Sequence, residues 1–503
     1  MYHIIISRLL LFVKEGNADW NNISSPGKNK REREGTLLLT EEVIRTFRSA
    51  GDLSVRKVKK GSAVYTLLFL EGMTDKKAIH DYILSPLLAA QGAAALKNLL
   101  TGGKPTELYD ETGAVNALLN GFAVIGDGET WYSVAVQNGA GRDVGEPATE
   151  TVIRGSREGF TENAQTNAAL IRRRLRSSRL KYEEMRIGEL SQTQVILMWI
   201  DGIVNEKVLA ELRARLKNVK TDVVFDSGEL ETRLQDGKSP LLPTVGNSER
   251  PDRVAAKLSE GRVAVIVSGS PVVLTVPYVF TESLQSTEDY SKSPFFASFL
   301  RLLRLSGLLV SVLLPAVFIA LLFFHQTAIP LSLLETIAEA REGIPFSPFA
   351  ETLFILLAFE TVREVGIRMP RAVGNAVSLA AALVLGDSAV KAGIASTPVL
   401  IAAAMASIGS FIVPPMMNAV TAVRILLLFA ARTAGFYGLY LVSAVLLIRL
   451  LAKSSFGIPY LSPLAPLSPT GIGDAVLMLP MRAQRALPAQ ITGKAKIRRK
   501  KLP

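Results

Sequence analysis

Residues 64–88 read VYTLLFLEGMTDKKAIHDYILSPLL and residues 194–218 read QVILMWIDGIVNEKVLAELRARLKN, and both follow one pattern. Each begins with a short apolar run typical of a buried strand, reaches an acidic residue followed by glycine, and continues into a helical pattern that opens at an N-cap residue. These three positions are Glu71, Gly72 and Asp75 in the first copy and Asp201, Gly202 and Asn205 in the second. The shared pattern predicts a duplicated strand–turn–helix unit.

The duplication continues further along the chain, in the same order. Residues 114–136, AVNALLNGFAVIGDGETWYSVAV, parallel residues 253–276, RVAAKLSEGRVAVIVSGSPVVLTV. Each stretch predicts a helix that ends at a glycine, followed by two strands joined by a tight turn rich in glycine. We therefore expect two related α/β subdomains, residues 36–145 and 146–290, each with a mixed sheet. Residues 1–35 are expected to be an N-terminal segment and a polar linker.

Composition divides the 503 residues into two halves. Hydrophobic residues make up 49% and charged residues 20%, whereas soluble domains carry about 25% charged residues. The chain is mixed up to about residue 290 and mostly apolar from Leu305 to Ala452. There is no cysteine and there are three histidines, so disulfides, thiolate nucleophiles and zinc sites are excluded or disfavoured. No phosphate-loop or dinucleotide spacing is present, and we expect no catalytic site, no metal and no cofactor.

The positive charge is concentrated in two places. Of the net charge of +12, eight positive charges lie beyond residue 480 with no acid among them. Beside a membrane domain, such a basic C-terminal tail (residues 456–503) is expected to contact anionic lipids rather than nucleic acid. A second basic run lies at residues 172–181. We interpret it as a solvated helix face or a subunit contact, with phosphate binding as the alternative.

The stretch from Leu305 to Phe324, LSGLLVSVLLPAVFIALLFF, is long and apolar enough to cross a bilayer. Pro315 within it predicts a kink. Arg301 and Arg304 precede this stretch and a net-acidic segment follows it, which places the soluble half on the cytoplasmic side. Further apolar runs lie at 397–413, 419–433 and 435–452. We expect four to six membrane segments, an even number, within a transmembrane domain at residues 291–455.

Residues 349–369, FAETLFILLAFETVREVGIRM, combine an apolar face with charges at helical spacing. These charged residues are Glu351, Glu360, Arg363, Glu364 and Arg368. We favour an ion-pair cluster at the cytoplasmic interface, with a charged vestibule for ions as the alternative.

Residues 372–391, AVGNAVSLAAALVLGDSAVK, are rich in small residues, which allow helices to approach closely. Packing alone explains them, but a polar stripe bounded by a charge pair favours a helix that lines a pore in a ring of subunits. The candidate pore-lining residues are Asn375, Ser378, Ala382, Leu385, Asp387, Ala389 and Lys391, with a hydrophobic constriction near Leu385.

Four stretches resemble the A subunits of spore germinant receptors, the GerA family. They are ETVIRGSREGFTENAQTNAALIRRRL from Glu150, ERPDRVAAKLSEGRVAVIVSGSPVVLTVP from Glu249, FETVREVGIRMPRAVGNAVSL from Phe359 and SFGIPYLSPLAP from Ser455. The resemblance implies a subunit of the inner spore membrane with two cytoplasmic α/β subdomains. It also implies a transporter-like B subunit and a lipoprotein C subunit as partners, a homo-oligomeric ring, and nutrient-gated release of monovalent cations.

The chain departs from the family at Asp387 and Lys391, where we expect a glutamine and a glutamate. A related spore membrane protein encoded with the dipicolinate-release genes is a near alternative. Three other functions stay open at this stage: a non-conducting receptor or scaffold that relays the signal, a secondary transporter, and an enzyme. The enzyme ranks last, because the sequence shows no catalytic site.

Overall fold

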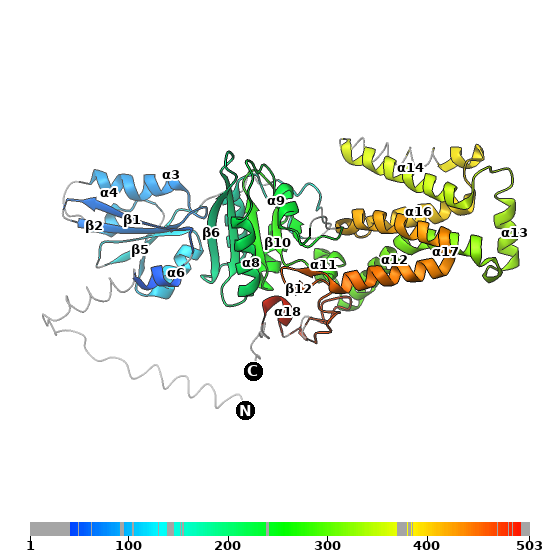
Figure 1. Cartoon of the computed structure of the whole chain (residues 1–503). Helices are drawn as coiled ribbons and strands as arrows, with labels where there is room; N and C mark the ends of the chain where they lie inside the picture. The colour runs from blue at the N-terminus through cyan, green and yellow to red at the C-terminus, as the bar shows by residue number, and fades with distance from the viewer. Residues whose placement is uncertain are drawn as a thin grey trace, which may run out of the picture. The chain divides into compact units, whose positions relative to one another are not determined.

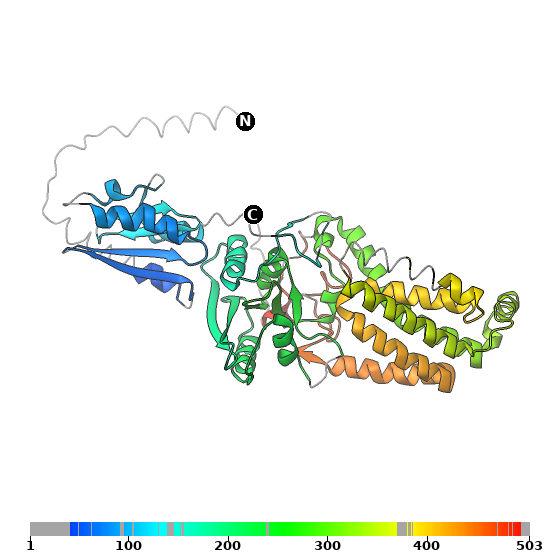
Figure 2. The same cartoon turned by 90° about the horizontal axis from the view of Figure 1, so that it is seen from above.

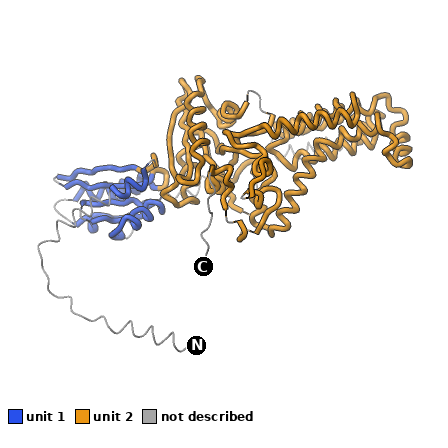
Figure 3. Tube along the Cα trace, turned by 60° about the horizontal axis from the view of Figure 1, so that its bottom comes forward, with its two compact units in different colours: residues 1–48, 54–70, 74–137 blue, residues 49–53, 71–73, 138–503 orange. Residues whose placement is uncertain are grey.

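The computed structural model describes residues 41–48, 50–61, 63–90, 95–102, 105–128, 130–137, 145–150, 152, 155–237, 241–369, 380, 384, 386–469, 471–480, 482–484 and 486–493. The chain forms two compact units (Figure 3). The first comprises residues 1–48, 54–70 and 74–137, and the second comprises residues 49–53, 71–73 and 138–503.

The first unit is built on a five-stranded sheet with the spatial order β1-β2-β4-β5-β3 (Figure 1). A core that includes Leu67, Ile83 and Val134 is fully buried between this sheet and its helices. The strands are β1 (Leu53–Lys60), β2 (Ala63–Leu70), β3 (Thr106–Leu108), β4 (Phe122–Gly126) and β5 (Trp131–Ala135). The helices are α3 (Lys76–Ile79), the π-helical turn η1 (His80–Leu84), α4 (Ser85–Ala89), α5 (Leu96–Leu99) and α6 (Glu111–Leu119).

The second unit contains a sheet of the same design, with the order β6-β7-β9-β10-β8. Its strands are β6 (Leu180–Ile187), β7 (Thr193–Ile200), β8 (Gly246–Ser248), β9 (Val263–Val267) and β10 (Val273–Val276). The helices of this α/β subdomain are α7 (Ala164–Arg174), α8 (Glu206–Lys217), α9 (Ser227–Leu234) and α10 (Pro251–Ser259).

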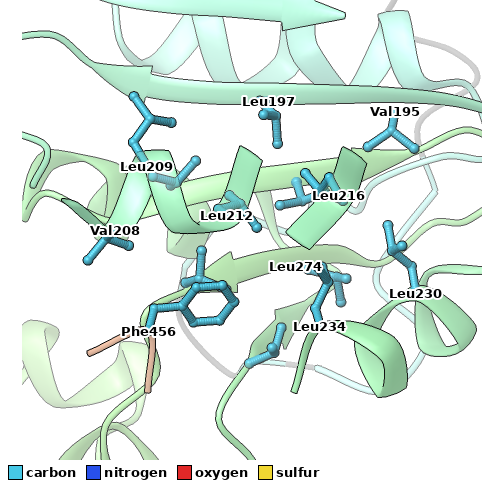
Figure 4. Close-up of a cluster of buried hydrophobic side chains, with 14 of the residues drawn as sticks. Val195, Leu197, Val208, Leu209, Leu212, Leu216, Leu230, Leu234, Leu274 and Phe456 are labelled. Atoms are coloured by element: carbon cyan, nitrogen blue, oxygen red, sulfur yellow. The ribbon is translucent and has the colours of Figure 1, made fainter. Parts of the chain in front are cut away.

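The continuous apolar run of β7 is explained by helices on both faces of this sheet. Val195 and Leu197 belong to the core under α8 and α9 (Figure 4), whereas Ile196 and Met198 belong to the core under α7 and α10. Successive side chains of a strand point to opposite faces, so a strand covered on both sides is apolar throughout.

The predicted duplication is confirmed by the matching strand order of the two sheets. The predicted caps form as well, since the side chains of Asp75 and Asn205 accept from the backbone of Lys77 and Lys207. The prediction of mixed sheets is wrong for the second sheet, in which every strand pair is antiparallel. The reason is that two hairpins, β6–β7 and β9–β10, lie side by side and β8 adds to the outer edge of β10.

The apolar half consists of helices, of which α14, α16 and α17 pack against α12 (Figures 1 and 2). They are α12 (Pro294–Phe324), α13 (Leu331–Glu339), α14 (Pro348–Arg368), α16 (Thr397–Phe411) and α17 (Met417–Ala452). Two described helices, at residues 294–324 and 414–452, are long and apolar enough to cross a membrane. The predicted four to six segments are therefore not confirmed. Pro315 is buried within α12, which continues through it as one helix, and the kink expected there stays a prediction.

Helix α17 folds back on itself at Gly435, whose φ and ψ are 58° and −138°. A Cβ at Gly438 would lie 2.3 Å from the carbonyl oxygen of Ala430, although residues eight apart in a straight helix are about 12 Å apart. Gly435 contacts Phe324 at the end of α12. The two predicted runs at 419–433 and 435–452 are therefore the two arms of one reversal.

The C-terminal segment returns to the α/β subdomain of the second unit. It contains β11 (Ser454–Ser455), β12 (Ile458–Pro459) and the short helix α18 (Ala489–Thr492). Tyr460 is fully buried, and its carbonyl oxygen accepts from Phe280 N. The described residues between 454 and 493 are thus part of the second unit, although the sequence predicted a basic tail from residue 456. The lysines and arginines from residue 494 onward lie outside the described residues.

Candidate functional site

The start of α12 is fixed to the α/β subdomain by a buried carboxylate, Asp289. This residue lies in η2 (Thr287–Ser291), a 3₁₀ turn that the Ser286 side chain caps. Asp289 is fully buried, and its two oxygens accept from Arg304 Nη1 at 2.7 Å and Nη2 at 2.8 Å. Arg301 Nε donates to the same carboxylate at 3.2 Å. The two arginines that precede the apolar span in the sequence are therefore paired within a buried network.

The C-terminal segment completes this network through Asp474. Arg301 Nη1 lies 3.0 Å from Asp474 Oδ1 and donates to the carbonyl oxygen of Ala475 at 2.9 Å. The hydroxyl of Tyr290 donates to Asp474 Oδ2 at 2.8 Å. We call Asp289, Tyr290, Arg301, Arg304 and Asp474 the junction cluster. It joins η2, the first apolar helix and the C-terminal segment; Asp289 precedes Arg301 by 12 residues, whereas Asp474 follows Arg301 by 173.

The two carboxyl groups of the junction cluster differ in pKa. Burial alone raises the pKa of Asp289, but the hydrogen bonds and charge of Arg304 and Arg301 outweigh it and hold this pKa below its usual value. Burial raises the pKa of Asp474, and its partner Arg301 only partly offsets this effect. The environment of Asp289 therefore favours its charged form, which faces both arginines.

A second buried network lies beside the first, between α10 and α11 (Phe280–Ser283). Glu282 lies 3.0 Å from Lys257 Nζ and 3.0 Å from Arg262 Nη2, and all three side chains are buried. Glu282 also accepts from Val279 N at 3.2 Å. Burial alone raises the pKa of Glu282, but the two cations outweigh it and lower this pKa. Burial lowers the pKa of Lys257 to about 8, with the charge of Glu282 opposing this shift.

Substituting Lys257 with methionine is expected to remove a pH dependence of stability between about pH 8 and pH 10. The pKa of Lys257 is lower in the folded state than in the unfolded chain. As the pH falls from 10.5, the unfolded chain therefore binds the proton first, and the free energy of unfolding decreases. The loss is complete below about pH 8 and amounts to roughly 3 kcal/mol. The measurement is the free energy of unfolding across this range in wild type and Lys257→Met. Parallel curves for the two proteins would contradict the prediction.

The basic run at residues 172–181 is used within the second unit. Arg172 is buried and lies 2.6 Å from Asp52 Oδ2. Arg174 pairs with Glu158, and Arg179 donates to the carbonyl oxygen of Asp201. The expectation of a solvated face is thus wrong for Arg172, whereas Arg176 and Arg179 are exposed, and the subunit contact stays a prediction.

The charges predicted to cluster along α14 separate into three pairs. Glu351 is buried near the start of the helix, where it accepts from Ser396 N and Oγ at 2.9 Å and lies 2.9 Å from Arg341. Glu360 pairs with Arg363 at 2.7 Å halfway along the helix. The exposed pair Glu364–Arg368, at 2.7 Å, lies at its other end. Glu351 thus does not join the cluster, since it lies more than two turns from Glu360.

Four of the candidate pore residues, Asn375, Ser378, Ala382 and Leu385, lie outside the described residues. The other three are described. Asp387 and Lys391 pair with each other at 2.7 Å and are exposed. Ala389 is buried in the core of its own chain. The pore assignment of this stripe stays a prediction.

Sequence reasoning missed Arg424, a single charge within the apolar run at 419–433. Its guanidinium is 2% exposed and donates to Ser311 O at 2.8 Å, Ser311 Oγ at 2.7 Å and Ala406 O at 3.0 Å. Arg424 therefore connects α17 to α12 and α16. The signal was present, because a lone arginine in an apolar run must find acceptors inside the bundle.

The fold defines a class: a duplicated α/β region followed by helices apolar enough to cross a bilayer, with a C-terminal segment that returns to the second subdomain. The family model described as Bacillus/Clostridium GerA spore germination protein matches residues 41–490 of this chain. The chain belongs to this GerA family of spore germinant receptor A subunits.

Relatives match over most of their length. Spore germination protein KA of Bacillus subtilis is 36% identical over 493 residues, which are 94% of this chain and 91% of that protein. The membrane protein YfkQ of the same organism is 34% identical over 94% of this chain and 93% of its own. The N-terminal domain of the A subunit of the Bacillus megaterium receptor GerK3 is 29% identical, with a TM-score of 0.36, and covers 48% of this chain and 94% of its own.

Proposed function

We propose that this chain is the A subunit of a germinant receptor in the inner spore membrane and that several copies form a nutrient-gated ion channel. A transporter-like B subunit and a lipoprotein C subunit are the proposed partners, and monovalent cations are the proposed cargo. The α/β subdomains and the C-terminal segment lie on the cytoplasmic side. The protein is proposed to act without catalysis.

The observation that carries the proposal is the junction cluster. Arg301 and Arg304 of the first apolar helix share the buried carboxylate of Asp289, which lies in η2, the turn between the α/β subdomain and α12. Asp474 brings the C-terminal segment to the same arginine. A rearrangement of the α/β subdomain therefore acts directly on the helices, as coupling between a sensing part and a conducting part requires.

The path of the chain supports the proposed topology. The N-terminal arm of α17 packs near the α/β subdomain, where Val420 and Leu284 share one core. Its C-terminal arm ends beside the same subdomain, where Ser455 Oγ donates to Thr244 O at 2.7 Å. Because α17 reverses at Gly435, both of its ends lie on the side from which α12 starts. An even number of crossings follows if each arm spans the bilayer.

We expect Leu385→Ala to raise the basal cation leak several-fold in liposomes that contain the assembled receptor. A shorter side chain widens a hydrophobic constriction and favours its wetting. The matched control is Ile401→Ala on α16, because Ile401 is an exposed apolar residue away from the stripe. The leak is measured as potassium efflux, together with the mass of the complex in nanodiscs. A monomer or dimer with an unchanged leak would favour the non-conducting relay instead.

A further inference from the structure

A pocket of about 710 Å³ lies between α14, α16 and the N-terminal arm of α17, and most of its lining is apolar. Leu400, Ala404 and Ile408 of α16 form one wall. Ile408 is 63% exposed, so part of this wall is open to the surroundings of the helices. The charged lining residues are Glu360, Arg363 and Arg424.

The charges in this pocket are unbalanced. Arg363 Nη2 lies 2.7 Å from Glu360 Oε2, but its buried Nε and Nη1 atoms have no hydrogen-bond partner among the described residues. Arg424 donates only to the neutral acceptors of Ser311 and Ala406, and no described carboxylate forms an ion pair with it. Glu360 also accepts from the hydroxyl of Thr421. Two cations therefore share one carboxylate, and the pocket carries a net charge of about +1.

The pocket lies toward the end of the helices that carries the α/β subdomain. Arg424 contacts Ser311, which follows Arg304 of the junction cluster by about two turns, or roughly 10 Å along α12. Phe411, at the end of α16, lines the same pocket. In the proposed orientation this depth corresponds to the cytoplasmic leaflet, just inside its headgroups.

We propose that this pocket binds one anionic glycerophospholipid of the cytoplasmic leaflet, an inference that rests on the membrane insertion of the proposed function. The phosphate accepts from the free N–H groups of Arg363 and faces Arg424, and an acyl chain lies along Leu400, Ala404 and Ile408. An uncompensated cation at membrane depth requires a counter-charge, and basic pockets between membrane helices on the cytoplasmic side suit anionic headgroups. A small soluble anion would leave the apolar wall uncovered, so a lipid fits better.

Native mass spectrometry of the full-length chain, purified in detergent and mixed with phosphatidylglycerol or phosphatidylcholine, tests this site. The wild type is expected to retain one phosphatidylglycerol per chain with at least a fivefold preference. Arg363→Gln should abolish the preference. Arg368→Gln is the matched control, because Arg368 lies on the same helix but is exposed and outside the pocket. Ile408→Trp should lower the retention of both lipids by filling the apolar wall.

Three other outcomes would contradict the proposed lipid site. Equal retention of the two lipids by wild type, or equal behaviour of Arg363→Gln and Arg368→Gln, would show that the pocket does not select an anionic headgroup. Competition by glycerol 1-phosphate as strong as that by the lipid would assign the site to a soluble phosphate. A change in oligomeric mass on Ile408→Trp, with lipid retention unchanged, would assign the pocket to a second copy of the chain.

Alkaline extraction of the membranes separates this inference from the proposed function. A chain that is released by carbonate would overturn membrane insertion, and the lipid site with it. A chain that stays inserted but shows no lipid preference would overturn the lipid site alone.

Discussion

Replacing Asp289 by asparagine is expected to lower the free energy of unfolding of the second unit by roughly 3–5 kcal/mol. The substitution keeps the shape of the side chain and removes the carboxylate that Arg301 and Arg304 share. Arg301 is fully buried, so its charge cannot be solvated by water instead. Asp474 then remains as the carboxylate partner of Arg301, at 3.0 Å, and breaking a buried pair by removing one partner is more destabilising than the original pair was stabilising.

The matched control for this substitution is Glu288→Gln, one residue earlier in the same turn. Glu288 pairs with Lys292 at 3.5 Å near the surface, and a pair of this kind contributes less than about 1 kcal/mol. Thermal unfolding of the full chain in nanodiscs, followed by tryptophan fluorescence, compares the two variants. If both unfold at the same temperature as the wild type, the junction cluster does not hold the helices to the α/β subdomain.

A pH series adds a second test of the same carboxylate. Because the folded pKa of Asp289 is lowered, its stabilising contribution is complete above the ordinary aspartate pKa and is lost as the pH falls toward the folded value. The difference in stability between wild type and Asp289→Asn should therefore shrink below about pH 4. A difference that stays constant down to pH 3 would assign the effect of the variant to packing instead of charge.

The duplicated subdomains could be predicted from the sequence because their signals are local. A strand, an acidic-glycine turn and an N-cap recur at fixed spacing, and Asp75 and Asn205 cap their helices as expected. Strands β1 and β6 were missed because their alternation of apolar and charged residues is weak. The antiparallel order of the second sheet was also missed, because a pattern along the chain does not state which strand edges meet.

The charged contacts of the candidate site could not be predicted from the sequence, for a different reason. Arg301 and Asp474 are separated by more than 170 residues, and their contact exists only because the C-terminal segment returns to α12. The same return hides Tyr460 and turns an expected tail into part of the core. Helical spacing did predict the pairs Glu360–Arg363 and Glu364–Arg368. It did not predict the partners of Glu351. These are Arg341, between α13 and α14, and Ser396, directly before α16.

Replacing Glu282 by glutamine is expected to destabilise the second unit by roughly 3–5 kcal/mol, and Lys257→Met should restore part of that loss. Glu282 is the carboxylate shared by Lys257 and Arg262, and all three side chains are buried. With glutamine at position 282, two cations repel each other in a medium of low dielectric constant. Methionine at position 257 removes one cation, while Arg262 retains Glu260, at 2.7 Å, as a partner.

The sign of the coupling free energy between these two substitutions shows whether Glu282 acts as a counter-charge. The double variant Glu282→Gln/Lys257→Met should be more stable than Glu282→Gln alone, because methionine removes one of the two cations that have lost their shared carboxylate. Free energies of unfolding of the wild type, the two single variants and the double variant form the cycle. Additive effects would mean that Glu282 acts through its hydrogen bond to Val279 N and not as a counter-charge. A non-additive rescue would instead establish a buried charge balance beside the junction cluster.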